Sequence, residues 1–255
     1  MEDYNMATVS GNWRGIAYHG GLWVAVGYSG RIATSTDDGK NWTTQTVGSY
    51  DWNNVAYGNG KWIAVANSGY ITYSIDNGVT WTTQRPGAST WYGIAYGNNR
   101  WVAVVGDHQI AYSIDNGVTW TTQRYPGPSS NYTWLNIAYG NGRWVAIGNI
   151  IATSTDGTSW SFQSVPTGSV WWEGIAYGNG RWIAVGNGCI ATSTNGIDWT
   201  TQAVGSGYWR SASYGNGFWV AAGDNGQFAY SVDGAIWIIK TIGSNTWNGI
   251  VVKTD

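Results

Sequence analysis

The sequence predicts an all-β protein built from repeated four-stranded antiparallel sheets, and three observations indicate it. Glycine contributes 38 of the 255 residues. Twenty Trp and 17 Tyr accompany only two Leu, although Leu is normally among the commonest residues. One pattern of aromatic and apolar residues recurs along nearly the whole chain. Glycine is a poor residue for helix interiors, whereas aromatic and β-branched residues favour strands, so short strands joined by tight turns are expected.

The pattern W-x-x-[IV]-A-Y-G-N-G-[RK]-W marks the repeats. Its first tryptophan begins six units and a stub, at spacings of 39, 39, 43, 38, 37 and 38 residues. A second Trp follows ten residues later and a third closes each unit, so that only Trp171 lies off the template. The first tryptophans are Trp13, Trp52, Trp91, Trp134, Trp172 and Trp209, and the stub begins at Trp247.

Each unit contains four strand signals, which the fifth copy shows well. Residues 174–177 form the first strand, Asn179-Gly180 a two-residue hairpin turn, and residues 181–186 the second strand. CIATST and WTTQA supply the third and fourth strands. Four antiparallel strands every ~40 residues is the length of a propeller blade. The sequence therefore predicts one domain over residues 1–255, a six-bladed β-propeller of four-stranded antiparallel blades.

The turn between the third and fourth strands carries a second motif, S-x-D-x-G-x-x-W. In it the Asp accepts hydrogen bonds from turn amides, Gly takes the positive φ, and Trp fills the blade beneath. Full copies occupy residues 35–42, 74–81 and 113–120, and copies one residue shorter occupy 154–160, 193–199 and 231–237, with Asn195 replacing Asp. The chain thus resembles the Asp-box (bacterial neuraminidase repeat-like) β-propellers over nearly its whole length.

Ring closure involves two terminal segments. The tail that starts at Trp247 resembles a seventh first strand, and MATVSGNW before Trp13 resembles a fourth strand. Residues 1–12 and 247–255 are therefore expected to close the ring. One segment completes the last blade and covers its edge, and the other serves self-association through terminal strands. Which segment does which stays open.

Strand order sorts the loops onto two faces. The Asn-Gly turns and the Asp-box turns share one face, which we call the scaffold face. The loops from strand two to strand three, and from strand four to the next repeat, lie on the opposite face, which we call the crown face. The crown loops are rich in hydroxyls, amides and aromatic rings, a chemistry that suits sugars, because a pyranose stacks on Trp or Tyr and its hydroxyls bond amides and carboxylates.

A non-catalytic, multivalent, lectin-like propeller that binds glycans on a cell surface is therefore the favoured function. The candidate ligand-binding residues are Trp52, Trp91, Trp134, Trp172, Trp209, Trp247, Asn67, Asp107, His108, Asn149, Asn187, Asp224 and Asn225. The competing interpretation of the first tryptophans is that they wedge between adjacent blades. If some of them stack on ligand, they must be partly exposed.

No enzyme activity is expected. Sialidases, which the Asp-box resemblance suggests, need an arginine triad, a Tyr–Glu pair, an acid Asp and an R-I-P motif. The chain has no R-I-P, its only glutamates are Glu2 and Glu173, and Arg100, Arg143 and Arg181 share a slot on the scaffold face. Two histidines, His19 and His108, give no convincing metal set, so neither metal nor cofactor is expected. A glycosidase using acids such as Asp51, Asp107, Glu173 and Asp224 remains an alternative.

Charge and hydropathy bound the partners. A net charge of −2 offers no footprint for nucleic acid, and no apolar run approaches the ~18 residues needed to span a bilayer, so neither nucleic-acid binding nor membrane insertion is expected. The start MEDYNMATVS does not look like a signal peptide. The resemblance implies an extracellular surface or a virion, such as a phage tail or fibre. A protein-interaction or tail scaffold is the alternative function.

Overall fold

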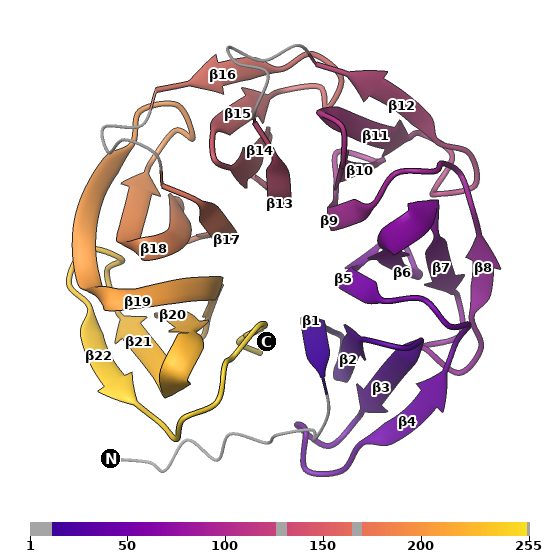
Figure 1. Cartoon of the computed structure of the whole chain (residues 1–255), viewed down its shortest axis with the longest axis horizontal. Coiled ribbons are helices and arrows are strands. Elements are labelled where there is room, and N and C mark those ends of the chain that lie inside the picture. The colour runs from indigo at the N-terminus through magenta and orange to yellow at the C-terminus, as the bar shows by residue number, and fades with distance from the viewer. Residues whose placement is uncertain (1–11, 126–131, 165–169, 254–255) are drawn as a thin grey trace.

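The computed structural model describes residues 12–125, 132–164 and 170–253 (Figure 1). This part of the chain contains 22 β-strands, two short 3-10 helices and no α-helix. No helix in it is long and apolar enough to cross a membrane. The predicted all-β architecture of four-stranded antiparallel sheets is confirmed in the described residues.

The first four repeats each form one four-stranded antiparallel sheet, in which the strands pair in chain order. Repeat one comprises β1 (Trp13–His19), β2 (Leu22–Gly27), β3 (Arg31–Ser35) and β4 (Thr43–Thr46), and repeat two comprises β5 (Trp52–Gly58), β6 (Lys61–Ala66), η1 (Asn67–Gly69), β7 (Ile71–Ser74) and β8 (Thr82–Gln84). Repeat three comprises β9 (Trp91–Gly97), β10 (Arg100–Val105), β11 (Gln109–Ser113) and β12 (Thr121–Arg124). Repeat four comprises β13 (Trp134–Gly140), β14 (Arg143–Gly148), β15 (Ile151–Ser154) and β16 (Ser161–Gln163).

The last two repeats share a six-stranded sheet because two of their strands are long. Strand β18 joins what are separate second and third strands in other repeats, and β19 joins a fourth strand to the next first strand. The far half of β19 pairs with β20, with Trp209 opposite Gly223. The strands are β17 (Trp172–Gly178), β18 (Arg181–Ser193), β19 (Thr200–Gly215), β20 (Phe218–Gly223), η2 (Asp224–Gly226), β21 (Gln227–Ser231) and β22 (Ile238–Thr241).

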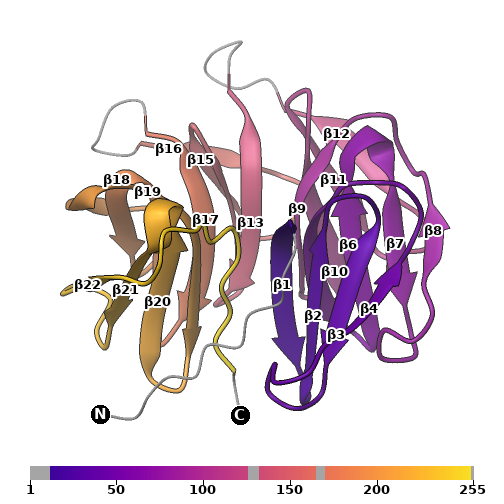
Figure 2. The same ribbon diagram turned by 60° about the horizontal axis from the view of Figure 1, so that its bottom comes forward.

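The sheets stand around a central axis with the first strand of each repeat innermost (Figure 1). These inner strands run in one direction, away from the crown face, which is uppermost in Figure 2. Tight Asn-Gly hairpins turn the chain on the scaffold face, for example at Asn179 and Gly180, which both have positive φ. This confirms the hairpin prediction and sets the crown loops apart from the repetitive turns.

Adjacent repeats pack through one recurring apolar interface. Val24, Val26 and Ile32 of repeat one face Trp52 and Trp62 of repeat two. Four further clusters repeat this arrangement through repeat six, with Val or Ile on one side and Trp and Ala on the other. Fully burying an aromatic ring of ~200 Å² contributes up to roughly 5 kcal/mol at about 25 cal/mol/Å². The regular tryptophans are therefore the framework of the ring.

The S-x-D-x-G turns adopt the predicted hydrogen bonding. In repeat one, the Asn41 amide donates to Asp37 at 2.9 Å, the Gly39 amide donates to Ser35 Oγ at 3.0 Å, and Trp42 Nε1 donates to the Gly39 carbonyl at 2.9 Å. The shorter fifth copy keeps this pattern with Asn195, whose Oδ1 accepts from two turn amides. We call these segments the Ser-Asp turns.

The tail after β22 lies between the sixth and the first repeat (Figures 1 and 2). The side chain of Asn248 donates to the Trp13 carbonyl at 3.0 Å, and Lys253 forms an ion pair with Asp38 at 3.0 Å. The sixth repeat already has its own outer strand, β22, so the tail does not complete that sheet. The other candidate closing segment, residues 1–11, lies outside the described residues.

Candidate functional site

The crown loops form one hydrogen-bonded surface. Backbone amides in the loops between strands two and three donate to the loops that connect successive repeats. Gly30 donates to the Tyr50 carbonyl at 2.6 Å, in the loop that leads into the next repeat, and Gly106 donates to the Thr90 carbonyl at 2.7 Å, in the loop that leads into its own repeat. Asp51 adds side-chain bonds, accepting from the Ser29 amide at 3.0 Å and from Asn67 Nδ2 at 3.3 Å. The backbone of this face is therefore held in place, and its side chains provide the variation.

The structure places five of the six candidate tryptophans where they cannot stack on a ligand. Their side chains are buried in the interfaces between repeats, with at most 1% of the surface accessible at Trp52, Trp91, Trp134, Trp172 and Trp209. Their rings cannot stack on a ligand because they already pack against the neighbouring repeat. The wedge interpretation of these five residues is right. Trp247, in the tail, is half-buried.

The predicted polar residues lie in the crown loops, apart from Asn187 in strand β18, and two of them have clear structural roles. Asn67 bonds Asp51, as described above, and Asn149 Oδ1 accepts from the Thr133 amide at 2.8 Å. Asn187, Asp107 and Asn225 are exposed, whereas His108 and Asp224 are half-buried. The structure does not gather these residues at one point, because they belong to different repeats around the ring.

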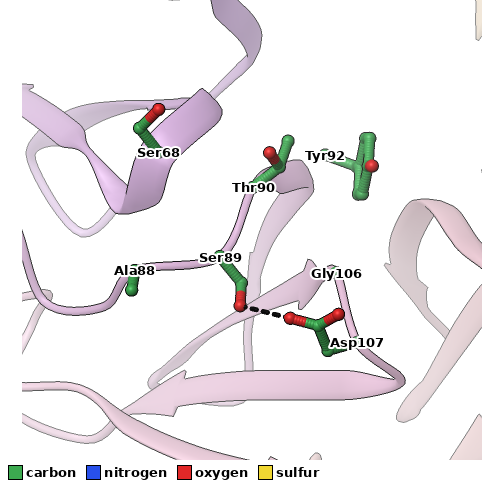
Figure 3. A pocket seen from close by; sticks show the side chains of 7 residues that line it. All are labelled: Ser68, Ala88, Ser89, Thr90, Tyr92, Gly106 and Asp107. Atoms are coloured by element: carbon green, nitrogen blue, oxygen red, sulfur yellow. Dashed lines mark hydrogen bonds between the residues drawn. The ribbon is translucent and has the colours of Figure 1, made fainter.

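A hollow of about 510 Å³ lies on the crown between repeats two and three. Ser68 lines it from repeat two, and residues 88–90 line it from the connecting loop. Tyr92 and Asp107 line it from repeat three. Ser89 Oγ donates to Asp107 Oδ2 at 2.7 Å (Figure 3). Hydroxyl groups, one carboxylate and one aromatic ring thus meet at this hollow.

A second hollow of about 230 Å³ adjoins the first and shares Tyr92 and Asp107 with it. Its other lining residues include Arg124, His108 and Tyr132. The rings of His108 and Tyr132 stack with their centroids 4.2 Å apart. The two hollows therefore form a polar and aromatic surface with a cation at one end and a carboxylate in the middle.

His108 occupies a backbone position that other repeats give to glycine. Its φ is 62°, and Gly30, Gly69 and Gly226 fill the equivalent place in three repeats. A Cβ at Gly69 would stand 2.1 Å from the Gly87 carbonyl oxygen, so a side chain does not fit there. Repeat three is followed by the longest connection in the sequence, and Tyr132 from it covers His108. A non-glycine residue at positive φ costs free energy and is typical of functional loops.

The residue directly after each first tryptophan also belongs to the crown, and of these residues the sequence singled out only Glu173. The inner strands begin at the crown, so this position lies near the crown end of the central channel. Its neighbours in the pattern are nearly constant, yet the position itself differs: Arg14, Asn53, Tyr92, Leu135, Glu173 and Arg210. Variation inside a constant pattern is the signal that could have found these residues.

Arg210 joins two carboxylates at this level. Its guanidinium forms ion pairs with Glu173 at 2.8 Å and with Asp224 at 2.9 Å, the second with both carboxylate oxygens. The hydrogen bonds from Arg210 lower the pKa of the Asp224 carboxyl, and those from Asp224 and Glu173 raise the pKa of the guanidinium. Asp224 is therefore held ionised at neutral pH.

Two crown aromatics are exposed in the last repeats. The side chain of Trp171 is 45% accessible and that of Tyr208 is 48% accessible. Each directly precedes a buried first tryptophan, and the Arg210 guanidinium lies 6.0 Å from the Tyr208 ring centre. Trp171 is the one tryptophan that departs from the repeat template, so its irregular place in the sequence was the signal of its exposure.

The cations of the scaffold face do not converge. The Lys61 ammonium donates to the Asn116 carbonyl at 2.7 Å, and Arg100 donates to the Asp156 carbonyl. Each side chain thus reaches the Ser-Asp turn of the following repeat. Among the described residues, no group of three or more His, Cys, Asp and Glu is placed to hold a metal ion.

No protein-family model matches the chain, and no curated protein matches it in sequence. Solved structures do match over most of its length. A streptogramin B lyase is 17% identical with a TM-score of 0.79, covering 98% of this chain and 90% of the lyase. YCF48 bound to D1 peptide is 19% identical with a TM-score of 0.68 (91% and 85% covered). The WD40 repeats of RRP9 are 8% identical with a TM-score of 0.76 (94% and 83% covered). These similarities show that the chain has a β-propeller fold.

Proposed function

We propose that the protein is a non-catalytic propeller with six complete blades whose crown face recognises a polypeptide. The six-stranded sheet then counts as two blades joined through β18 and β19. The polypeptide makes its principal contact at the hollows around Tyr92 and Asp107. The residues that follow the first tryptophans contact the rest of the polypeptide.

The observation that carries this proposal is the difference between repeats at the crown. Arg14, Tyr92 and Glu173 occupy one slot of the repeat but differ in charge and shape. A multivalent lectin needs similar sites in each repeat, and the buried first tryptophans remove the shared platform for such sites. A polypeptide presents different side chains in succession, so it matches a surface that changes from one repeat to the next.

Two further points support the proposal. One propeller of similar fold, YCF48, has been solved with a peptide bound, which shows that this architecture accommodates such a ligand. The crown also provides Arg and Tyr, the residue types that dominate binding energy in protein interfaces. Partly exposed examples are Arg14, Tyr92 and Arg210.

The non-catalytic part of the proposal rests on the described carboxylates. Glu173 and Asp224 are both ion-paired with Arg210, and the hydrogen bonds from Arg210 lower the pKa of the Asp224 carboxyl. A general acid must hold a proton near the working pH, so Asp224 is not suited to donate one. Asp107 is paired with Ser89 and lies in a different repeat from both.

Selection from a random-peptide display library tests the proposal. Peptides enriched on the wild-type protein are measured again on Tyr92→Ala and on Asp107→Ala. We expect at least one crown variant to weaken binding about tenfold or more, because 1.4 kcal/mol corresponds to a factor of ten. Ile114→Thr is the matched control, since Ile114 is 69% exposed in the Ser-Asp turn of the same repeat. Peptides that lose affinity for the control and keep it for the crown variants would contradict the proposal.

Glycan recognition is the second candidate function, and one observation favours it. Trp171 and Tyr208 are exposed aromatic rings near the Glu173, Arg210 and Asp224 cluster, so repeats five and six offer a stacking surface beside polar partners. A glycan array probed with the wild-type protein and with Trp171→Ala tests this function. Binding that the substitution abolishes supports it, and no binding at millimolar sugar rejects it.

A further inference from the structure

The tail takes the place of the first strand of a further repeat. In repeat two, a Cβ added at Gly58 would meet the Tyr96 ring of the next repeat at 2.1 Å. A Cβ added at Gly215, the equivalent glycine of repeat six, would meet the Val252 side chain and the Lys253 carbonyl oxygen of the tail at 2.7 Å. Val252 lies five residues after Trp247, as Tyr96 lies five residues after Trp91. The tail therefore follows repeat six as each first strand follows the repeat before it.

The tail also precedes repeat one in the same manner. Asn53 of repeat two donates to the Trp91 carbonyl of repeat three at 2.8 Å. Asn248 of the tail donates to the Trp13 carbonyl of repeat one at 3.0 Å. Asn248 of the tail thus makes the same hydrogen bond to repeat one that Asn53 of repeat two makes to repeat three. The ring consequently has a seventh place, which the described residues fill with a single inner segment.

Repeat six carries residues adapted to hold this segment. Ser211 Oγ accepts from the Ile250 amide at 3.2 Å, and Ser213 Oγ accepts from the Val252 amide at 3.0 Å. The other repeats have Gly or Asn at the first of these positions and Ala at the second. No strand of the described chain pairs with residues 248–252. The tail is therefore held by repeat six and repeat one, and among the described residues it has no second strand paired with it.

The apolar face of repeat one lacks the cover that the other repeats have. Trp13 and Trp23 are half-buried, whereas the equivalent Trp52 and Trp62 have 0% and 1% of their surface accessible. The five apolar clusters link repeats one to six in succession, and Trp13 and Trp23 belong to none of them. The tryptophan-bearing face, which is buried against the preceding repeat in repeats two to six, is thus partly exposed in repeat one.

We infer that this seventh place is a docking site for a β-hairpin of the repeat's own pattern, carried by a partner polypeptide. The hairpin supplies the second and third strands of a blade and adds to the open edge of the tail. In the existing interfaces, Val145 and Ile147 of repeat four face Trp172 and Trp182 of the next repeat. A docked hairpin presents such aliphatic residues to Trp13 and Trp23.

A synthetic peptide with the sequence of residues 143–163 is the probe, because it contains the hairpin of the second and third strands of repeat four, followed by the fourth strand that pairs with the third, and has no cysteine. The matched control peptide carries Asp at the positions of Val145 and Ile147, which keeps the length and turns and removes the apolar face. Amide exchange of residues 248–252 is followed by mass spectrometry in the full chain. We expect the pattern peptide to slow this exchange at least tenfold and the control peptide to leave it unchanged.

Equal exchange with and without both peptides, or equal slowing by both, would overturn the inference. So would a dimer of the chain alone that already slows exchange in residues 248–252, since a second copy would then be the occupant. Amide exchange of residues 248–252 is also measured on Asp107→Ala, to distinguish binding at the seventh place from binding at the crown. Because Asp107 lies on the crown in repeat three, the pattern peptide is expected to slow this exchange in the variant as much as in the wild type.

Discussion

The imidazole of His108 stacks on the ring of Tyr132, with the ring centroids 4.2 Å apart, at a backbone position where three other repeats have glycine. The His108 side chain thus stands at a left-handed φ in this crown loop, where it lines the second hollow together with Asp107 and Arg124. Strain of this kind persists where the surrounding structure maintains it. It distinguishes repeat three from its neighbours.

Two substitutions of His108 distinguish the free-energy cost of its positive φ from the contribution of its side-chain contacts. His108→Ala removes the stacking and keeps a Cβ at positive φ, whereas His108→Gly removes both. We expect His108→Gly to be more stable than His108→Ala by about 1 kcal/mol in urea unfolding, and both to weaken peptide binding. Equal stability of the two variants would show that this φ costs little here.

Two tryptophans test the division between framework and crown. Trp101→Ala leaves a cavity in the interface of repeats two and three, so it is expected to lower the free energy of unfolding by about 3–5 kcal/mol. Trp171→Ala removes an exposed ring and is expected to change it by at most about 0.5 kcal/mol. Chemical denaturation measures both. A large loss of stability from Trp171→Ala would contradict the assignment of that ring to ligand contact.

The fold was more predictable than the site. The repeated pattern determines the strands and turns, but it gives residues at the crown and residues in the core the same place in the pattern. The strands, the Asn-Gly turns and the bonding of Asp37 follow from local chemistry that recurs in every repeat. The burial of Trp52 could not be read from sequence, because a ring of that type serves equally as a wedge or as a platform. The departures from the pattern carried the functional signal: Trp171 lies off the template, and Glu173 stands in a variable slot.

The Ser-Asp turns are expected to stabilise the folded protein less at acidic pH than at neutral pH. Hydrogen bonds from the Thr80 side chain and backbone lower the pKa of Asp76 to about 2. An unfolded Asp titrates near about 4, so the folded state favours the ionised form. This contribution is present above about pH 4 and is lost as the pH falls toward about 2.

Urea unfolding of the wild type and of Asp76→Asn between about pH 5 and about pH 2 measures that contribution. We expect the difference in unfolding free energy between the two proteins to shrink as the medium becomes acidic. A difference that stays constant over this range would mean that the carboxylate charge of Asp76 does not stabilise the turn.

Arg210 controls the ionisation of its partner. In Arg210→Met, the Asp224 carboxyl loses its two hydrogen bonds from the guanidinium, so its pKa is expected to rise toward the usual range. Carboxyl-carbon NMR titration of Asp224 follows the change. Arg31→Met, also a crown cation, is the control and should leave the titration of Asp224 as it is. An unchanged Asp224 curve in Arg210→Met would exclude the ion pair in solution.

Ser211 and Ser213, which accept hydrogen bonds from the tail, are expected to slow amide exchange in it. Replacing Ser211 by Gly and Ser213 by Ala restores the residues typical of other repeats and removes both acceptors for the tail amides. Each such bond is worth roughly 1 kcal/mol, so amide exchange at Ile250 and Val252 is expected to quicken by about tenfold or more. Unchanged exchange would show that other contacts hold the tail.

The most direct test of crown recognition is an amide-exchange footprint of the full chain with a peptide selected on it. The proposal predicts slower exchange at residues 88–92 and 106–108, which, except for the buried Trp91, line the hollows around Tyr92 and Asp107. The turns at residues 75–79 and 114–118, on the scaffold face, should exchange as in the free protein. Protection confined to those turns, with no change at residues 88–92 and 106–108, would contradict the account.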